Sequence, residues 1–259
     1  MLRKALSILV LPLVFTACED DFTSGNMNQT AQEPFEFAVD ASGATVLYLD
    51  AINSVITVTG VSADDSVRVE GVREVRSNTV EDAEARLDDL LVSWEVVGDT
   101  VYVETEQPEN TEGRTYQVEY NITLPRNFEV VVESANATID VASINNSVYV
   151  EVGNGIVDLD DTQGDISIDI GNGEVLGTLT LPTDGALEVL IGNGIIDIGI
   201  PTSTSAEFSA GVGNGTISIS NLMLQNQQST NTSLSGRLGA GDGDIRLTVG
   251  NGTITVTGF

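Results

Sequence analysis

Residues 187–198 read Leu-Glu-Val-Leu-Ile-Gly-Asn-Gly-Ile-Ile-Asp-Ile, and this stretch contains the pattern that decides the fold. Its Gly-Asn-Gly centre occurs five times toward the C-terminus, and the first four copies are almost evenly spaced. A period of about 20 residues is typical of repeat proteins, in which each short unit stacks on the next. The five copies are Gly153-Asn154-Gly155, Gly171-Asn172-Gly173, Gly192-Asn193-Gly194, Gly213-Asn214-Gly215 and Gly250-Asn251-Gly252.

Apolar and polar residues alternate on both sides of each tripeptide, which is typical of strands with one buried face. Around the third copy, alternate residues from Leu187 to Ile191 and from Ile196 to Ile198 are apolar. Glycine adopts positive φ without a steric penalty, and asparagine tolerates it better than most residues, so we expect a sharp turn at each copy. Weaker copies centre on Asn136 and Asn53, as is typical near the end of a stack.

Two architectures fit this repeat. In a β-solenoid each coil pairs in parallel with the next, and the apolar faces point into a narrow core. In an antiparallel meander each Asn-Gly would form a two-residue hairpin turn, which the alternation does not exclude. A meander needs a second layer over its apolar face, and no amphipathic segments large enough to supply one are visible. We therefore predict an all-β solenoid over residues 133–259, with coils of about 18–21 residues.

The composition excludes several classes of function. The 259-residue chain has 39 acidic and 10 basic residues, which gives a formal net charge of −29. Nucleic-acid binding requires a basic face, so we expect no nucleic-acid partner. The chain has no histidine, which removes histidine-based triads, most zinc sites and the commonest general base.

Residues 1–17 are predicted to be a lipoprotein signal peptide. Arg3 and Lys4 precede a short apolar segment, and Phe15-Thr16-Ala17-Cys18 is similar to a lipobox, whose cysteine becomes lipidated. Phe15 departs from the usual leucine, and an ordinary secreted protein with a free Cys18 is the alternative. Several acyl chains on Cys18 would hold the protein to a membrane.

Residues 18–34 are polar and acidic and are predicted to form a flexible linker. The run Glu19-Asp20-Asp21 resembles a surface-export signal of lipoproteins from Bacteroidetes-like bacteria, and a solvated linker is the alternative reason for it. We expect an outer-membrane lipoprotein on either the periplasmic or the cell-surface side.

Residues 35–132 are predicted to hold the first degenerate coil and a small β-rich lobe that caps the stack. Apolar residues on one helical face predict a single helix from Thr79 to Leu91, with Asn78 or Thr79 as its N-cap. Gly98-Asp99 is predicted to turn a hairpin.

The layout of strand pair, lone helix, Gly98-Asp99 hairpin and Gly-Asn-Gly-x-Ile-x-Val series, closing in Gly241-Asp242-Gly243-Asp244-Ile245, resembles known families. It is similar to the bacterial "putative adhesin" β-strand-repeat families of unknown function, which include the head GIN domains. The resemblance covers most of residues 40–259 and implies a right-handed β-helix-like solenoid on the cell envelope, with a role in adhesion. These families define no catalytic residue, so none is carried over.

Several other residues are weighed as functional candidates. A polar insertion, residues 222–238, is expected to lengthen one coil and is a candidate recognition loop. Asp242 and Asp244 are the best local pair for calcium, but a ladder of stacked asparagines along the turns is the favoured interpretation. The candidates for polysaccharide hydrolysis, which are ordinary surface residues in the favoured interpretation, are Asp158, Asp160, Asp161 and Asp165.

We therefore expect a lipid-anchored, non-catalytic structural or adhesive module that contacts an envelope protein or a glycan, with no metal and no cofactor. A scaffold or accessory in envelope signalling is the alternative, followed by a polysaccharide-modifying enzyme. A concave surface with an aromatic cluster and two carboxylates about 5–9 Å apart would favour the enzyme.

Overall fold

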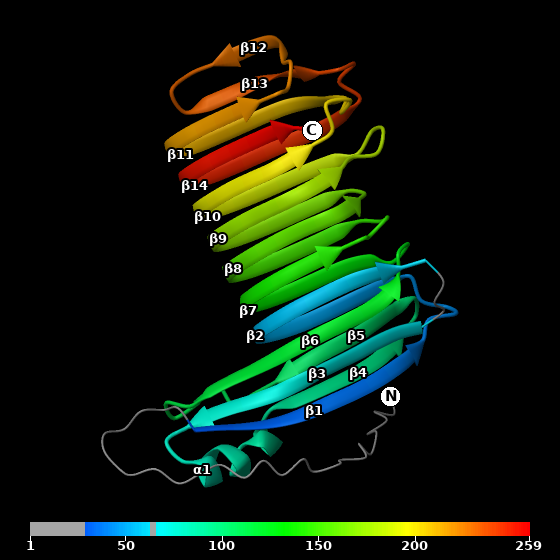
Figure 1. Cartoon of the computed structure of the whole chain (residues 1–259), viewed down its shortest axis with the longest axis vertical. Coiled ribbons are helices and arrows are strands. Elements are labelled where there is room, and N and C mark those ends of the chain that lie inside the picture. Colours follow the sequence, from blue (N-terminus) through cyan, green and yellow to red (C-terminus); the bar gives the residue numbers. More distant parts are fainter. Residues whose placement is uncertain (1–28, 63–65) are drawn as a thin grey trace.

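The structure is a computed structural model that describes residues 29–62 and 66–259, so the predicted signal peptide and Cys18 lie outside the described residues. Figure 1 shows an elongated stack of strands that runs from an N-terminal lobe to a hairpin at the opposite end. In chain order the elements are β1 (Gln29–Asp40), β2 (Val46–Val61), β3 (Ser66–Ser77), α1 (Val80–Ala85), the 3-10 turn η1 (Leu87–Asp89), β4 (Leu91–Val97), β5 (Thr100–Glu106), β6 (Thr115–Pro125), β7 (Glu129–Ala142), β8 (Val148–Gln163), β9 (Ile166–Thr180), β10 (Ala186–Ile200), β11 (Ala206–Ser220), β12 (Gln225–Ser229), β13 (Ser233–Leu238) and β14 (Gly243–Gly258).

The coils of the stack are the long strands β2, β7, β8, β9, β10, β11 and β14. We call the part of each coil before its central asparagine the first leg and the part after it the second leg. Neighbouring coils are parallel, with Val132 of β7 beside Val150 of β8, which lies beside Ile168 of β9. Parallel pairing excludes the meander, whose neighbours would be antiparallel. The prediction of an all-β solenoid is therefore confirmed.

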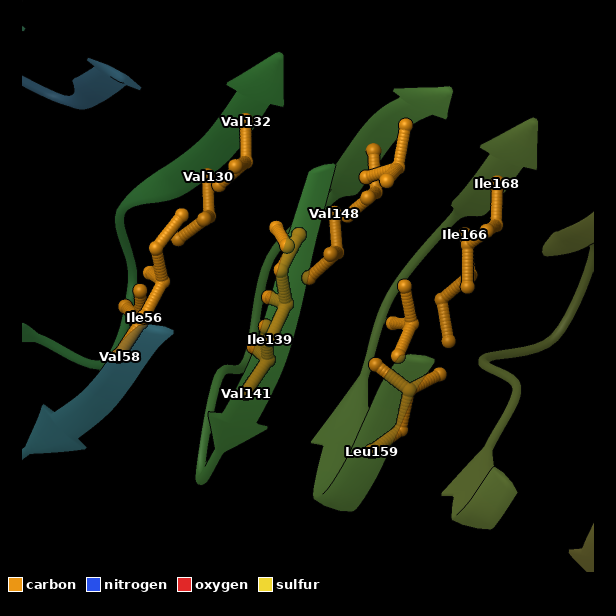
Figure 2. Packing of buried hydrophobic residues seen from close by; sticks show 14 of the residues in the cluster. Ile56, Val58, Val130, Val132, Ile139, Val141, Val148, Leu159, Ile166 and Ile168 are labelled. Atoms are coloured by element: carbon orange, nitrogen blue, oxygen red, sulfur yellow. The ribbon is translucent and has the colours of Figure 1, made fainter. Parts of the chain in front are cut away.

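The core is a narrow layer of aliphatic side chains between the first legs and the second legs. In Figure 2, Val130 and Val132 extend from the first leg of β7 toward the space also entered by Ile139 and Val141 from its second leg. All four side chains are fully buried or nearly so. A single coil would leave this row open on both sides, so burial of the core depends on stacking.

The glycines at the turns are required by contact between coils as well as by backbone conformation. Gly194 has φ of +154°, and a Cβ there would lie 1.7 Å from the carbonyl oxygen of Gly173 in the neighbouring coil. At Gly192 a Cβ would lie 2.4 Å from the carbonyl oxygen of Gly171. The asparagine between them, Asn193, does not have positive φ. The prediction that asparagine is needed here for a left-handed backbone conformation is therefore wrong. Asparagine is instead needed for the hydrogen bonds of its side chain, described below.

The N-terminal lobe extends both layers of the stack. Strands β6, β3 and β1 continue the layer of second legs beyond β2, and β5 and β4 continue the layer of first legs. An aromatic cluster fills the space between them, with Phe37 stacked on Trp94 at 5.6 Å between ring centroids and Phe35 edge-on to Tyr120 at 5.7 Å. The lobe thus covers the first end of the aliphatic core.

One predicted boundary in the lobe is wrong. Strand β1 begins at Gln29 and pairs with β3, so residues 29–34 do not belong to the predicted linker of residues 18–34. Within this segment Ala31 is buried and Glu33 is half-buried. The polar composition of the segment hid its place in the strand, because one of its inward positions is Glu33, whose carboxylate pairs with Arg73.

The helix is shorter than the predicted Thr79–Leu91. Thr79 is its N-cap, and its hydroxyl accepts a hydrogen bond from the backbone N–H of Asp82 at 3.1 Å. The α-helix ends at Ala85, and Leu91 already belongs to β4. The Arg73 guanidinium donates to the carbonyl oxygen of Leu90 at 2.6 Å, which holds the chain in a non-helical path. The predicted Gly98-Asp99 hairpin is confirmed, because Val97 and Thr100 are antiparallel partners.

The last coil in the sequence is not the last coil in the stack. Strand β14 lies between β10 and β11 and is parallel to both, as Figure 1 shows. The sequence predicted that residues 222–238 lengthen one coil, and this prediction is wrong. The segment instead forms the β12–β13 hairpin. Strand β13 pairs antiparallel with the first leg of β11. Leu234 and Leu238 are buried there, so the insertion covers the end of the core.

Candidate functional site

The turns of the coils form one column of asparagine side chains. Each amide nitrogen from Asn136 onward donates a hydrogen bond to the side-chain oxygen of the preceding asparagine, at 2.8–3.0 Å. At the lobe end, Asn53 donates to the side chain of Gln107 at 3.5 Å. In stack order the column is Asn53, Asn136, Asn154, Asn172, Asn193, Asn251 and Asn214.

This column has capacity for further hydrogen bonds. An asparagine amide has two N–H donors and an oxygen with two acceptor positions, and the column uses one donor and one acceptor of each internal member. The column therefore links the coils and also presents one N–H and one acceptor position at each coil, about 4.8 Å apart along the stack.

The outer face of the first legs carries a row of carboxylates. Its members are register partners on successive strands, so each lies about 4.8 Å along the sheet from the next. Like charges on neighbouring strands are destabilising, which makes the row costly for folding alone. The row ends at Leu190 of β10, the register partner of Asp169. It consists of Glu104, Asp50, Glu133, Glu151 and Asp169.

A row of tyrosines lies beside the carboxylates. Tyr102 and Tyr48 are register partners with ring centroids 5.4 Å apart, and Tyr149 lies on the same row with Val131 between. Tyr102 is 37% and Tyr149 39% exposed. Aromatic rings next to carboxylates suit lysine and arginine side chains, through cation–π contacts and charge-assisted hydrogen bonds. We call the carboxylate row and the tyrosine row together the acidic face.

The two rows affect one another electrostatically. Burial raises the pKa of Tyr48 to about 12, and a hydrogen bond to Glu133 and the charge of Glu133 add to this effect. Burial, followed by the charge of Glu133, also raises the pKa of Asp50. Both shifts mean that further negative charge is disfavoured here, so a cation bound at this position would be stabilised.

An open groove of about 740 Å³ lies where the asparagine column meets the lobe. Asn53, Asn136 and Asn154 line it together with Arg114 and Tyr116. Arg114 donates to both carboxylate oxygens of Asp82, at 2.7 and 2.9 Å. These hydrogen bonds, followed by one from Ser77, hold the pKa of Asp82 below its ordinary value. The guanidinium is therefore already paired within the lobe.

The aspartates considered for hydrolysis are all exposed, three of them on the second leg of β8 and one just before β9. Asp158 is an exposed outward residue on the second leg of β8. Asp161 lies at the end of that leg, 3.8 Å from the Arg126 guanidinium. Asp165 starts the next coil, where its carboxylate accepts from the backbone N–H of Ala186 at 2.9 Å. Asp160 is exposed on the same leg of β8, between Asp158 and Asp161.

The calcium candidates also serve the local structure. The Asp242 carboxylate accepts from the Ser205 hydroxyl at 2.8 Å, and Asp244 points outward from β14 beside Glu207 of β11. Among the described residues no group of three or more His, Cys, Asp or Glu side chains is arranged to hold a metal ion.

The acidic face is not among the features predicted from the sequence. A signal was available, because Glu133, Glu151 and Asp169 recur at the same interval as the turn asparagines, and each lies just upstream of the asparagine of its own coil. Aligning the coils on their asparagines places these carboxylates in one column. The partners from the lobe, Glu104 and Tyr102, follow no repeat and could not be found in this way.

The chain belongs to the Toastrack DUF4097 family, which matches residues 23–257. A solved structure described as a "putative cell adhesion protein" from Clostridium sporogenes ATCC 15579 is 17% identical, with a TM-score of 0.50 over 88% of this chain and 100% of that chain. A "putative adhesin" from Bacteroides fragilis NCTC 9343 is 11% identical, with a TM-score of 0.29 over 86% of this chain and 97% of that chain. The family match agrees with the resemblance predicted from the sequence.

No curated protein matches the chain. Within residues 29–62 and 66–259, no helix has both the length and the apolar character needed to cross a membrane.

Proposed function

We propose that this protein is a lipid-anchored, non-catalytic module of the cell envelope that adheres to basic segments of partner proteins through its acidic face. The observation that carries the proposal is the alignment of five carboxylates beside three tyrosines on one exposed sheet face. The description of the Clostridium sporogenes relative as a cell adhesion protein supports a role in adhesion. The anchor would be Cys18, and the solenoid would be right-handed, as the family resemblance implies.

We assign the acidic face to binding rather than to hydrolysis. A glycosidase holds its two carboxylates on either side of a sugar ring, whereas these carboxylates follow one another along the outer face of a sheet. The groove beside the asparagine column lies at the turns and is not lined by the acidic face. A row of evenly spaced charges instead suits many weak contacts with an extended partner, which add to one another.

A matched pair of variants tests this assignment. The first replaces Glu133 and Glu151 by glutamine and Asp169 by asparagine on the acidic face. The control replaces Asp140, Asp158 and Asp197 by asparagine, which removes the same charge from exposed positions on the second legs. With beads coated in poly-L-arginine as the probe, we expect the first variant to bind about tenfold more weakly and the control about twofold or less. Equal losses would show that net charge alone drives binding and would overturn the assignment.

Anchoring and location need separate tests. Cys18→Ser should move the protein from the membrane fraction to the soluble fraction while leaving bead binding unchanged. Protease treatment of intact cells should remove the protein if it faces outward, as adhesion to other surfaces requires. Protection from protease, together with capture of another envelope protein, would favour the alternative of a scaffold in envelope signalling.

A further inference from the structure

The position of β14 in the stack is not required by the spacing of the coils. Ile191 of β10 and Val212 of β11 are both register partners of Val249 in β14. The sequence offset between Ile191 and Val212 equals the offset between Ile170 of β9 and Ile191, although β9 and β10 are direct neighbours. Strand β11 therefore has the spacing to stack directly on β10, yet β14 lies between them.

We call the space between β10 and β11 the slot. Strand β14 fills the slot and pairs with β10 on one side and with β11 on the other. Its inward side chains, such as Ile254 and Val256, are fully buried there. The connection that leads into β14 contains Gly239 and Gly241, with φ of +56° and +81°, on either side of the exposed Ala240. Short connections that change backbone direction in this way are suited to act as hinges for an exchanged element.

Strand β14 makes the same kinds of contact with its two neighbours as the other coils of the stack make with theirs. Asn251 donates to Asn193 and accepts from Asn214, both at 2.8 Å. At Gly252 a Cβ would lie 1.7 Å from the carbonyl oxygen of Gly194, as between other neighbouring coils. The C-terminal coil of another molecule would make the same contacts, because none of them depends on belonging to the same chain.

We propose that the slot between β10 and β11 accepts the C-terminal coil of a second copy of this chain, so that two copies folding side by side exchange β14 reciprocally and form a dimer. Exchange normally exposes the core while the element is absent. Here the vacated slot can close, because β10 and β11 have the sequence offset of direct neighbours. The proposal depends on the order of the coils and not on the acidic face or the anchor.

Disulfide trapping between two labelled chains tests the exchange. Both chains carry Cys18→Ser, one also carries Asp197→Cys, and the other carries Thr255→Cys. Asp197 and Thr255 are register partners on β10 and β14, with outward side chains. After co-refolding of an equimolar mixture and mild oxidation, we expect a disulfide-linked dimer of the two chains on a non-reducing gel.

The control mixture replaces Asp197→Cys by Asp158→Cys, which is also an exposed position in the same row but on β8. This mixture should give only the background due to collisions. Equal yields from the two mixtures, or no dimer from the first, would overturn the proposal. Circular dichroism of each variant before mixing ensures that a missing dimer does not reflect failure to fold.

Closure of the slot can be tested separately, by a disulfide between β10 and β11 within one chain. In one chain with Cys18→Ser, Asp197→Cys and Ser218→Cys, β14 separates the two thiols by two strand spacings, about 9.6 Å. A disulfide requires Cα atoms within about 7 Å, so it forms only when β14 is outside the slot. We expect this disulfide to accumulate during refolding but not in the folded protein. Thiols that stay reduced throughout refolding would contradict closure.

Discussion

The stack of coils and the N-terminal lobe are continuous in both layers, but they are held together in different ways. In the stack, rows of valine and isoleucine are buried between legs, glycine backbones are in contact at the turns, and one asparagine per coil bonds to the next. In the lobe, large individual side chains carry the packing, such as Phe37 on Trp94, and arginines such as Arg114 form ion pairs with aspartate. A change in the stack therefore acts on the neighbouring coil, whereas a change in the lobe acts on one contact.

The largest expected difference concerns a Cβ added at a glycine. Gly194→Ala in the stack would bring a Cβ to 1.7 Å from a neighbouring backbone oxygen, at a residue with φ of +154°. Since backbone cannot move out of the way as a flexible side chain can, we expect a loss of about 4 kcal/mol or failure to fold. The measurement is the free energy of unfolding in denaturant.

The matched control for this substitution lies in the lobe. A Cβ added at Gly43 meets nothing within 4 Å, and φ there is not in the left-handed region. Gly43→Ala should change the free energy of unfolding by about 0.5 kcal/mol or less. If both substitutions had the same effect, backbone contact between coils would not be what makes glycine necessary at the turns.

The difference between the repetitive stack and the non-repetitive lobe also determines how much of each could be predicted from the sequence. Parallel stacking and the alignment of Asn154, Asn172 and Asn193 follow from the repeat, because coils of similar length and pattern can only superimpose their turns. The repeat does not determine the order of the coils. Strand β14 carries the same Gly-Asn-Gly repeat as β10 and β11, so the repeat alone does not place it between them.

In the lobe, prediction was limited by contacts between residues far apart in sequence. The helix was predicted too long because its apolar spacing continues to Leu91, whereas Arg73 binds the carbonyl of Leu90. The start of β1 at Gln29 depends on pairing with Ser77. The acidic face includes residues that the repeat could predict and one that it could not. Glu133, Glu151 and Asp169 recur at a fixed interval in the sequence. Glu104 joins them only because β5 pairs with β2.

A smaller effect is expected from removing one member of the asparagine column. Asn172 donates to Asn154 at 2.9 Å and accepts from Asn193 at 2.8 Å. Asn172→Ala removes both hydrogen bonds from an exposed position, where water can replace part of the interaction. We expect a loss of about 1 kcal/mol in the free energy of unfolding.

An asparagine of the lobe provides the comparison. Asn121 is exposed on β6, and none of the described residues provides a hydrogen-bond partner for its side chain. Asn121→Ala should change stability by about 0.5 kcal/mol or less. A loss at Asn121 as large as that at Asn172 would mean that the column contributes nothing beyond what any surface asparagine contributes.

The smallest effect concerns pH, and the two regions should respond with opposite sign. In the lobe, hydrogen bonds from Arg114 lower the pKa of Asp82 below 3.8. Asp82 therefore contributes stability above the ordinary pKa, and this contribution is lost as the pH falls through the lowered value. On the acidic face, burial and Glu133 raise the pKa of Asp50. Asp50 therefore contributes stability only at acidic pH, and that contribution is lost as the pH rises through the raised value.

Asp82→Asn should accordingly lower the denaturant midpoint at neutral pH, and a smaller loss should persist near about pH 3, because the contribution of Asp82 disappears only as the pH falls through its lowered pKa. Asp50→Asn should raise the midpoint slightly at neutral pH, because it removes a carboxylate that is charged at a cost, and should give no gain near about pH 3. Unfolding curves of the two variants at both pH values measure this. If Asp50→Asn destabilised the protein at neutral pH, the carboxylate row would be part of what holds the coils together. The row would then no longer stand out as a feature retained for binding at the expense of stability.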